Sequence, residues 1–419
     1  MEVAVEPSAV RGTISAPSSK SAMQRAVACA LMADGKTEII NPSLCEDAIA
    51  AMKMAECLGA GIKRLTDRII IEGGYRPVCN KLYCGESGLG ARIFSVLAAL
   101  NSNWMEIYGS GSLLSRPFNV LEQTLTQMGA EVFTSDGLLP IKVKGPLQGS
   151  LAFVDGSVSS QFLTGLLIAL PVLGADSRII VNNLKSKPYI DLTINILNRF
   201  GIEIINENYE VFNIPGLQKY KSITYTVEGD WSGAAFLFVL AAIAGMVRVK
   251  GISNMSTQPD IAIIDILRKA GADVEVTDNV IIVKQAMLNS FETDITDCPD
   301  LAPPLAVLAS FCRGKTIISG TERLKVKESN RGEALAAELS KIGVKIQNYN
   351  DRIEIEGPSV IKGGKVSSHG DHRISMALTI MSAMAENRVI ITGAESVRKS
   401  YPAFFEDLSQ LGVQLKTIE

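Results

Sequence analysis

Residues 266–276, ILRKAGADVEV, combine three signals that recur along the whole chain. Apolar residues with helical spacing lead to Gly271, and apolar and polar residues then alternate as they do in a strand. Many helices end at a residue with positive φ, a conformation that glycine adopts without steric cost. The stretch therefore predicts a helix, a tight stop and a strand.

The same pattern occurs five more times. The copies are AECLGAGIKRL (55–65), TLTQMGAEVFT (124–134), ILNRFGIEIIN (196–206), ELSKIGVKIQN (338–348) and DLSQLGVQLKT (407–417). The six glycines, at positions 59, 129, 201, 271, 343 and 412, follow one another at steps of about 70 residues. Such regular spacing indicates an internal repeat and not a chance similarity.

Each repeat contains further elements around this pattern. A turn and a second strand follow it, for example in 62–74 and 344–357. Helices that are apolar on nearly all faces precede it and are expected to be buried; they are 87–100, 159–173, 232–245 and 300–312. A unit of strand, helix, strand, helix and hairpin, six times over, predicts two domains of three repeats. The glycine-containing junction VEGDWSGAA (227–235) is the expected crossing between them.

Composition excludes several classes of protein. The chain has 419 residues, of which 47% are hydrophobic and 20% charged, with a net charge of -3, as in an ordinary globular protein of two or more domains. This balance gives no global basic field for nucleic acid. The acidic start MEVAVEPSAV does not resemble a signal peptide, and the apolar run 234–247 is too short to span a membrane. We expect a cytoplasmic protein.

Cysteine and histidine give little indication of a metal or disulfide framework. Seven cysteines are scattered without a Cys-x-x-Cys motif, which argues against both structural zinc and a disulfide scaffold. The only histidines are His369 and His372. Two histidines at this spacing could ligate a metal, but no other ligands stand at a recognisable distance.

Polar segments lie where loops enter the expected helices, and nearly every one carries lysine or arginine. The segments are SSKSAMQR (18–25), ESGLGAR (86–92), GSLLSRP (111–117), GSVSSQF (156–162), KSKPYID (185–191), PDLAPP (299–304), RLKVKESNR (323–331), GDHR (370–373) and VRKSYP (397–402). Each one alone could be a solvated loop or a helix cap. Their recurrence at comparable places favours a site for small ligands that carry phosphate and carboxylate, because lysine, arginine and helix N-termini bind such groups.

Two features of these segments bear on the chemistry. The stretch SAPSSKSAMQRA (15–26) lacks the glycines of a Walker loop, so it is either an anion-binding helix N-terminus or a polar turn. Asp300 and Glu328 lie among the cations, where a carboxylate stays ionised and can accept a proton. A salt bridge or a helix cap is the alternative for both.

The set SSKSAMQR, DGSVSSQFLTGLL, SKPYIDLT, RLKVKESNR, GDHRISMAL and VRKSYPAFFEDL resembles the EPSP synthase (3-phosphoshikimate 1-carboxyvinyltransferase) family, in the family's order and over essentially the whole chain. The resemblance implies an α/β (α+β) fold, a two-domain inside-out α/β barrel with six βαβαββ repeats, three per domain. The expected domains are 15–227 and 1–14 with 228–419, with crossings near 14 and 228, that close on the ligands.

The resemblance also implies the reaction. The enolpyruvyl group of phosphoenolpyruvate passes to the 5-hydroxyl of shikimate 3-phosphate by addition and elimination, giving 5-enolpyruvylshikimate 3-phosphate and phosphate. No metal and no organic cofactor is expected. The expected partners are the two small-molecule substrates, with no nucleic acid, no membrane and a monomeric enzyme.

Site residues follow from the resemblance motif by motif. The expected catalytic residues are Asp300 as base for the 5-hydroxyl, Glu328 as acid and base at C3, and Lys20 beside both substrates. Contacts to shikimate 3-phosphate are expected from Lys20, Ser21, Arg25, Ser159, Ser160, Gln161, Ser186, Tyr189, Asp300, Arg323 and Lys327. Contacts to phosphoenolpyruvate are expected from Lys20, Gly88, Arg92, Arg116, Gln161, Arg331, Arg373 and Lys399. His372 is expected in the wall of the site.

The chain departs from the family's pattern in places. The usual Asn-Ala-Gly-Thr segment is Glu86-Ser87-Gly88-Leu89 here, and Ile93 replaces a proline, so sensitivity to the family's inhibitor glyphosate stays open. Arg323 stands where some members have asparagine. The alternatives are the sister enolpyruvyl transferase that acts on UDP-N-acetylglucosamine and a non-catalytic anion-binding protein. The serine-rich segments argue against the first, and the two carboxylates argue against the second.

Overall fold

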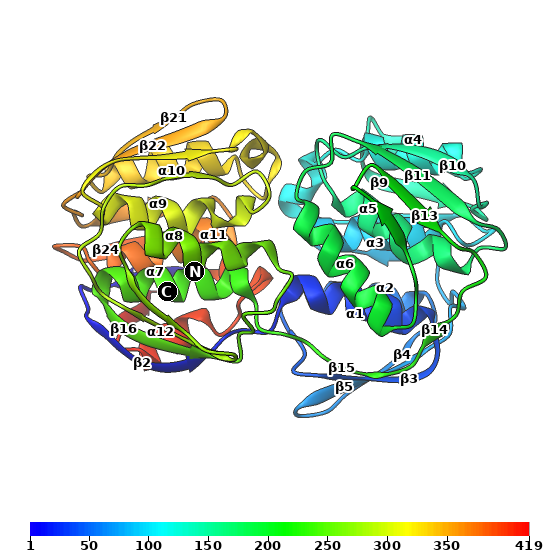
Figure 1. The fold of residues 1–419 in the computed structure, drawn as a ribbon, viewed down its shortest axis with the longest axis horizontal. Coiled ribbons are helices and arrows are strands. Elements are labelled where there is room, and N and C mark those ends of the chain that lie inside the picture. The colour runs from blue at the N-terminus through cyan, green and yellow to red at the C-terminus, as the bar shows by residue number, and fades with distance from the viewer. Residues whose placement is uncertain (419) are drawn as a thin grey trace. The chain divides into compact units, whose positions relative to one another are not determined.

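The computed structural model describes residues 1–418, and the chain divides into two compact units. The N-terminal unit is Ser18–Val227, and the C-terminal unit consists of Met1–Pro17 together with the chain from Glu228 onward. The chain therefore passes from one unit to the other twice, after Pro17 and after Val227 (Figure 1).

The N-terminal unit contains three βαβαββ repeats. The first consists of α1 (Lys20–Met32), β3 (Ala33–Ile40), α2 (Glu46–Cys57), β4 (Gly61–Arg64) and β5 (Arg68–Gly73). The second consists of β6 (Lys81–Tyr83), α3 (Gly88–Ala98), β7 (Met105–Tyr108), α4 (Asn119–Gln127), β8 (Glu131–Ser135) and β9 (Leu138–Lys144). The third consists of β10 (Leu151–Asp155), α5 (Gln161–Ala169), β11 (Ser177–Asn182), α6 (Lys187–Arg199), β12 (Ile205–Glu207) and β13 (Val211–Ile214). The first repeat takes its missing strand from β14 (Tyr220–Lys221) and β15 (Thr224–Thr226), which pair with β3 in parallel.

The C-terminal unit repeats this plan. Its first repeat consists of β2 (Val10–Ser15), α7 (Trp231–Ala244), β16 (Gly245–Lys250), α8 (Ile263–Lys269), β17 (Asp273–Val276) and β18 (Val280–Lys284). Its second consists of β19 (Glu292–Asp294), α9 (Ala302–Phe311), β20 (Gly314–Ser319), α10 (Arg331–Lys341), β21 (Lys345–Asn348) and β22 (Arg352–Gly357). Its third consists of β23 (Gly364–Ser367), α11 (His372–Ser382), β24 (Val389–Thr392), α12 (Phe404–Gln410) and β25 (Leu415–Ile418).

Every sheet has the same internal order. In the second repeat β6 pairs with β7 in parallel, and β7 pairs with β9, which forms an antiparallel hairpin with β8. The N-terminal residues complete two sheets of the C-terminal unit. The strand β1 (Glu2–Val5) lies between β24 and β25, and β2 pairs in parallel with β16.

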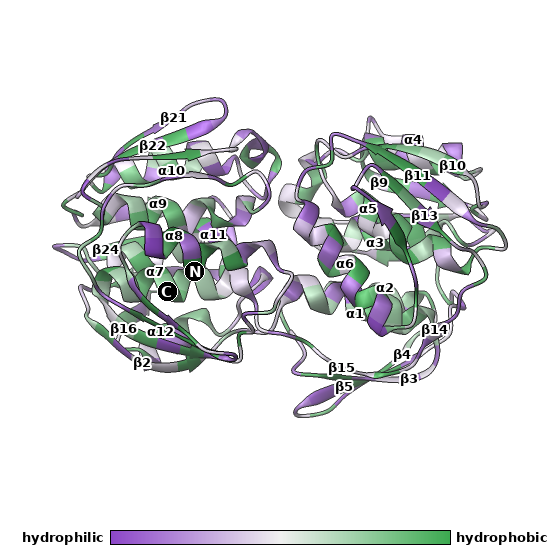
Figure 2. Cartoon of the chain, in the orientation of Figure 1, coloured by the Kyte–Doolittle hydropathy of each residue, from purple (hydrophilic) through white to green (hydrophobic). Residues whose placement is uncertain are grey.

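The apolar helices form the core of each unit. Every residue of α7 is buried, and the buried parts of α9 and α11 pack in the same cluster of the C-terminal unit. The hydropathy of α7 and α9 is correspondingly high along their length (Figure 2). The helices α1, α3 and α5 occupy the same place in the core of the N-terminal unit. Burial of the four apolar segments is confirmed.

The repeated glycines end α2, α4, α6, α8, α10 and α12, as predicted. All six have positive φ, between +81° and +112°. At Gly59, a Cβ atom would also lie 2.4 Å from the carbonyl oxygen of Arg76, so both backbone conformation and space require glycine there. The α/β fold with six βαβαββ repeats is therefore confirmed.

The structure contains one disulfide that the sequence does not indicate. Cys57, at the end of α2, forms a disulfide with Cys79, and their Cα atoms are 5.1 Å apart. The other five cysteines are free and buried. The pair has no sequence motif, because it depends on a helix end meeting the loop that follows the hairpin.

Among residues 1–418, no helix is long and apolar enough to cross a membrane.

Candidate active site

The residues expected in the site fall into two groups, one in each unit. In the N-terminal unit they lie at or near the N-termini of the buried helices α1, α3 and α5, and of α6. Ser19 caps α1 by accepting a hydrogen bond from the backbone of Ala22. Ser87 caps α3, and its hydroxyl also donates to Gln24 of α1 at 2.8 Å. These bonds place the polar first turns of α1 and α3 side by side.

Two arginines converge on Gly88. Arg92 donates through Nη1 to the carbonyl oxygen of Gly88 at 3.1 Å and to Oε1 of Gln161 at 3.0 Å. A Cβ atom on residue 88 would lie 2.6 Å from Nη1 of Arg116 and 2.9 Å from Nη1 of Arg92. A side chain at position 88 would therefore displace both guanidinium groups. Two buried cations close to a helix N-terminus suit a phosphate.

Lys20 forms an ion pair that the sequence does not indicate. Its Nζ atom lies 3.0 Å from Oδ2 of Asp47, in the first turn of α2. Both side chains are largely buried. No motif marks Asp47, which appears in the sequence as an ordinary helix-capping acid.

The serines and Arg25 lie around the starts of α5 and α6. Ser159 accepts a hydrogen bond from the backbone of Gln161, and Ser186 precedes α6 with a φ of 56°. Arg25 is 1% exposed and donates to the carbonyl oxygens of Ser21 at 2.9 Å and Tyr189 at 3.3 Å. Burial lowers the pKa of Arg25 to about 10, because desolvation disfavours the charged form. Ser160 is also buried.

In the C-terminal unit, Arg331 joins three carboxylates. Its Nε lies 2.8 Å from Oδ2 of Asp371, its Nη1 2.7 Å from Oδ1 of Asp300 and its Nη2 2.5 Å from Oε2 of Glu328. Arg331 lies at the start of α10, and its side chain is 1% exposed. The expected carboxylate clamp and both expected acid–base residues therefore form one cluster.

Asp300 is held ionised by cations. Oδ2 of Asp300 lies 2.9 Å from Arg373, and Oδ1 lies 3.6 Å from Lys327. Burial raises the pKa of Asp300, but Arg373, Lys327 and Arg331 outweigh burial and hold this pKa well below its ordinary value. The pKa of Lys327 is lowered to about 8, mainly by burial, although Asp300 opposes the change. An ionised carboxylate next to a lysine that titrates near neutrality is suited to proton transfer.

Other expected residues of the C-terminal unit bond backbone carbonyl oxygens. Lys399 donates to the carbonyl oxygen of Gly370 at 2.8 Å, just before α11. Arg323 donates to the carbonyl oxygen of Thr296 at 3.3 Å. His372 is buried at the start of α11, whereas His369 bonds Oε1 of Glu338 at 2.7 Å. In residues 1–418, no group of three or more His, Cys, Asp or Glu could hold a metal ion.

Sequence reasoning missed two carboxylates in this unit. Asp371 is wholly buried, caps α11 and accepts from Arg331 and from Oγ of Ser329 at 3.1 Å. Its place in the GDHR segment was a usable signal, because aspartate is a favoured N-cap residue. Asp260 is also buried and accepts from Oγ of Ser232 at 2.7 Å. No local pattern marks Asp260.

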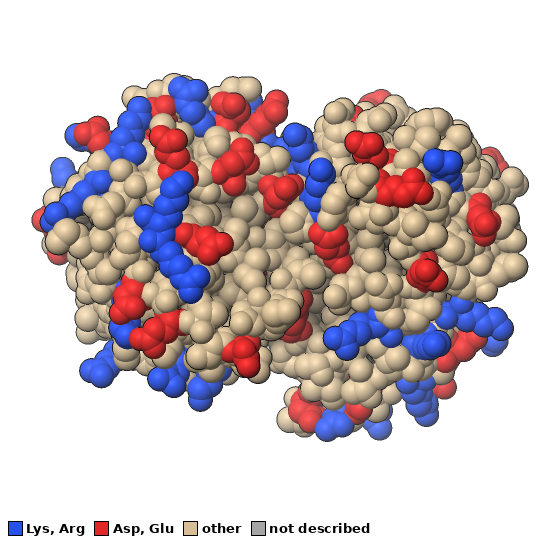
Figure 3. Space-filling model, viewed as in Figure 1, with Lys and Arg blue, Asp and Glu red and all other residues tan. Residues whose placement is uncertain are grey.

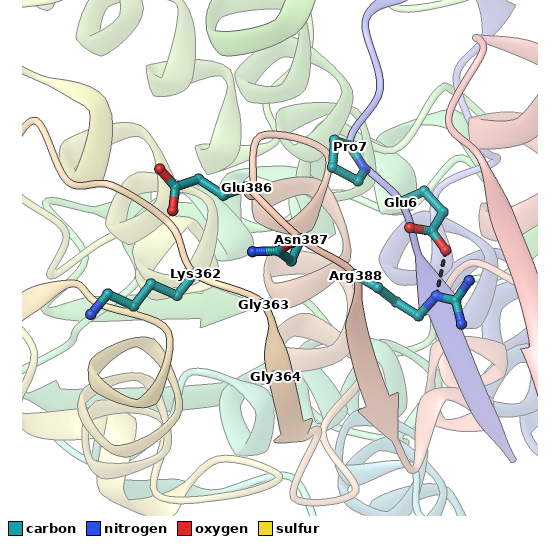
Figure 4. A pocket seen from close by; sticks show the side chains of 8 residues that line it. All are labelled: Glu6, Pro7, Lys362, Gly363, Gly364, Glu386, Asn387 and Arg388. Carbon is teal, nitrogen blue, oxygen red and sulfur yellow. Dashed lines mark hydrogen bonds and ion pairs between the residues drawn. The ribbon is translucent and has the colours of Figure 1, made fainter.

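The surface also carries charged groups and a hollow outside the expected site. Lys and Arg alternate with Asp and Glu on the visible face of each unit (Figure 3). A hollow of about 780 Å³ in the C-terminal unit contains none of the expected residues (Figure 4). It is lined by Glu6, Pro7, Lys362, Gly363, Gly364, Glu386, Asn387 and Arg388. Its Arg388 is paired with Glu6, so that cation is already neutralised.

The fold is that of enolpyruvyl transferases. The chain is similar over its full length to two solved structures of EPSP synthase from Acinetobacter baumannii, with TM-scores of 0.86 and 0.85 and sequence identities of 26% and 25%. Both comparisons cover 100% of each chain. The enolpyruvyl transferase NikO from Streptomyces tendae shares the fold, with a TM-score of 0.80 at 15% identity, over 99% of this chain and 98% of that one.

Sequence relatives define the family. Residues 5–408 match the family model of EPSP synthase (3-phosphoshikimate 1-carboxyvinyltransferase). The chain is 37% identical over 416 residues to the 3-phosphoshikimate 1-carboxyvinyltransferase of Clostridium kluyveri, covering 99% of this chain and 98% of that protein. It is 38% identical over 417 residues to the one from Methanocaldococcus jannaschii, covering 97% of each. The chain belongs to the EPSP synthase family and is a transferase of the shikimate pathway, as the sequence analysis expected.

Proposed function

We propose that the two groups of residues bind shikimate 3-phosphate and phosphoenolpyruvate and carry the enolpyruvyl transfer that family membership gives this chain. The observation that best supports the assignment is the ionised Asp300 among Arg331, Arg373 and Lys327. A buried carboxylate in a pure anion-binding site would repel the ligand. The surrounding cations keep Asp300 ionised, so it is free of a proton and can accept one from a substrate hydroxyl.

In this proposal the oxygen of the 5-hydroxyl attacks C2 of the enolpyruvyl group, and Asp300 accepts the proton of that hydroxyl. Glu328 delivers a proton to C3 and takes one back when phosphate leaves from C2, so the double bond is restored. Both carboxylates bond Arg331, which keeps them at fixed positions relative to each other. Fixed positions reduce the entropy cost of assembling the reacting groups.

Binding of the phosphate and carboxylate groups is assigned by charge. Arg92 and Arg116, with the backbone at Gly88, bind the phosphate of phosphoenolpyruvate together with Lys399. Arg331 and Arg373 bind its carboxylate. Arg331 and Arg373 lie in the first turns of α10 and α11, where the backbone adds favourable positive potential.

Shikimate 3-phosphate is assigned to the remaining residues. Ser159, Ser160 and Ser186 surround its phosphate, and Ser21 and Arg25 bind its carboxylate. Tyr189 also contacts this substrate, and Gln161 lies between the two ligands. Lys20 contacts both substrates. Asp300, Arg323 and Lys327 contact the shikimate ring. We further infer a monomeric enzyme that works in the cytoplasm.

The test is phosphate release from the purified protein. Wild type is expected to release phosphate only when phosphoenolpyruvate and shikimate 3-phosphate are both present. Asp300→Asn keeps the shape of the side chain but cannot accept a proton, and it should lower kcat at least 100-fold, the range typical of a lost general base. The matched control is Asp265→Asn, on the exposed side of α8, which should retain wild-type kcat.

Three outcomes would count against the proposal. Phosphate release without shikimate 3-phosphate would indicate a phosphatase. Full activity of Asp300→Asn would remove Asp300 from the chemistry. A rise in melting temperature with UDP-N-acetylglucosamine but not with shikimate 3-phosphate would indicate the sister transferase.

A further inference from the structure

A buried hydrogen-bonded cluster lies one helical turn inside the proposed site for shikimate 3-phosphate. Three helices of the N-terminal unit, α1, α5 and α6, begin at residues assigned to this substrate. One turn further along, each helix contributes one polar side chain to the cluster: Arg25, Thr164 and Thr193. All three are at most 1% exposed.

Thr193 is the centre of this cluster. Its Oγ1 lies 2.8 Å from Nε of Arg25, 2.8 Å from the carbonyl oxygen of Tyr189 and 3.1 Å from Oγ1 of Thr164. Thr164 in turn lies 3.5 Å from Nη2 of Arg25 and 3.3 Å from the carbonyl oxygen of Ser160. The two hydroxyls thus connect Arg25 to the first turns of α5 and α6.

The proton count of the cluster fixes the direction of its bonds to Arg25. A hydroxyl has one proton and two acceptor lone pairs, whereas a guanidinium only donates. Thr193 donates its proton to the carbonyl oxygen of Tyr189 and accepts from Nε–H of Arg25. Thr164 has one proton, which it can give to the carbonyl oxygen of Ser160 or to Thr193. Thr193 is in either case the side-chain acceptor that sets the plane of the guanidinium.

The charge of Arg25 is left for a ligand. In the described part of the chain, Arg25 has no carboxylate partner; its acceptors are two hydroxyls and two carbonyl oxygens. Arg331, an equally buried arginine, in contrast bonds three carboxylates. A buried guanidinium held only by neutral groups gains most from an incoming anion, provided that its orientation is fixed beforehand.

We propose that Thr193, supported by Thr164, is a positioning residue that orients Arg25 for the carboxylate of shikimate 3-phosphate and so determines the affinity for that substrate. The inference rests on the proposed function, because it assumes that Arg25 contacts this substrate. Thr193 itself touches no substrate. It acts by fixing Arg25 and by joining α1 to α6.

Removing the hydroxyl tests the inference. Thr193→Val keeps the shape of the side chain but leaves Nε–H of Arg25 without its acceptor. The KM for shikimate 3-phosphate, and its Kd measured by calorimetry without phosphoenolpyruvate, should rise on the order of tenfold, the change expected for one lost hydrogen bond to a charged group. The kcat and the KM for phosphoenolpyruvate should stay within about twofold of wild type, and Thr193→Ser should restore the affinity.

Thr124→Val is the matched control. Thr124 is also a buried helix threonine of the N-terminal unit, and it donates to the carbonyl oxygen of Val120 at 2.8 Å, four residues back. It has no arginine partner, so its replacement should leave both KM values unchanged. If Thr193→Val does not fold, Thr164→Val is compared with Thr124→Val instead, and a smaller rise of about threefold in the KM for shikimate 3-phosphate is expected.

The outcomes separate this inference from the proposed function. An inactive wild type would overturn the proposed function and the inference with it. The inference alone would be overturned if wild type is active but Thr193→Val has the same KM for shikimate 3-phosphate as Thr124→Val. The same holds for Thr164→Val where it replaces Thr193→Val. Equal losses in kcat and in both KM values, or a Thr193→Ser variant as weak as Thr193→Val, would show a merely structural role and would also overturn it.

Discussion

Replacing Arg331 by methionine should destabilise the C-terminal unit strongly. The side chain is 1% exposed, and its removal leaves Asp371, which is wholly buried, without its cation. Removing one partner of a buried ion pair typically costs about 3–5 kcal/mol. Asp300 keeps Arg373 and Lys327, and Glu328 is partly exposed, so these two add little. We expect a loss of about 4 kcal/mol in the free energy of unfolding at pH 7.5.

The loss should shrink as the pH falls. In wild type, the depressed pKa of Asp300 adds stability above the unfolded pKa of about 3.9, and this contribution is lost as the pH falls through the lower folded value. Without Arg331, one of the cations that hold down the folded pKa of Asp300 is gone, so this pKa rises. Protonation then relieves the unpaired charge, by about 1.4 kcal/mol for each unit of pKa change. At pH 5 the difference between variant and wild type should fall to about 2–3 kcal/mol.

The chain contains two tryptophans, one in each unit, and this permits a direct assay. Trp231 is fully buried at the start of α7, whereas Trp104 is partly exposed in the N-terminal unit. In a Trp104→Phe background, the fluorescence of Trp231 reports unfolding of the unit that holds Arg331. Guanidinium titrations at pH 5 and pH 7.5 then give the difference in the free energy of unfolding between variant and wild type at each pH.

Arg25→Met is the matched control. Arg25 is an equally buried arginine, but its partners are neutral. Its replacement, followed through Trp104 in a Trp231→Phe background, should cost stability by an amount that does not change between pH 5 and pH 7.5. A loss for Arg331→Met that is below about 1 kcal/mol, or that is equally independent of pH, would refute the reasoning.

Three further predictions follow from named groups. Denatured protein should show five reactive thiols before reduction and seven after it, because Cys57 and Cys79 are linked; seven thiols before reduction would exclude the disulfide. Since Lys327 loses its charge above its pKa of about 8, kcat/KM for shikimate 3-phosphate should decline above pH 8 in wild type, and Lys327→Arg should abolish the decline; an unchanged profile would contradict this role. Burial, with the charge of Asp300, raises the pKa of Asp260 to about 6, so the folded state binds the proton more tightly than the unfolded state does. Wild type therefore loses stability as the pH rises from about 4 to about 6. Asp260→Asn should therefore gain about 2–3 kcal/mol over wild type between pH 4 and pH 7.5 in guanidinium titrations, and a constant difference would be evidence against it.

The repeat was predictable because its signals are local. A helix stop such as Gly271 and the alternation that follows it lie within one stretch of eleven residues, ILRKAGADVEV. Neighbouring residues determine the backbone φ at the helix end and the alternation of faces in the strand, so each repeat can be recognised from its own sequence. The clustering of lysine and arginine at helix starts was equally visible, and with the family's motifs it indicated the ligands' chemistry.

Other features required the tertiary structure. The strand β1 pairs with β25, so Glu2 lies opposite Ile418, and no local pattern records a pairing between the two ends of the chain. The same holds for Cys57 with Cys79, Lys20 with Asp47 and Arg25 with Thr193. A threonine or a single aspartate has no distinctive spacing when its partner is on another helix. The sequence alone thus determined the repeated elements and the kind of ligand, whereas only packing between distant segments decided which side chains meet.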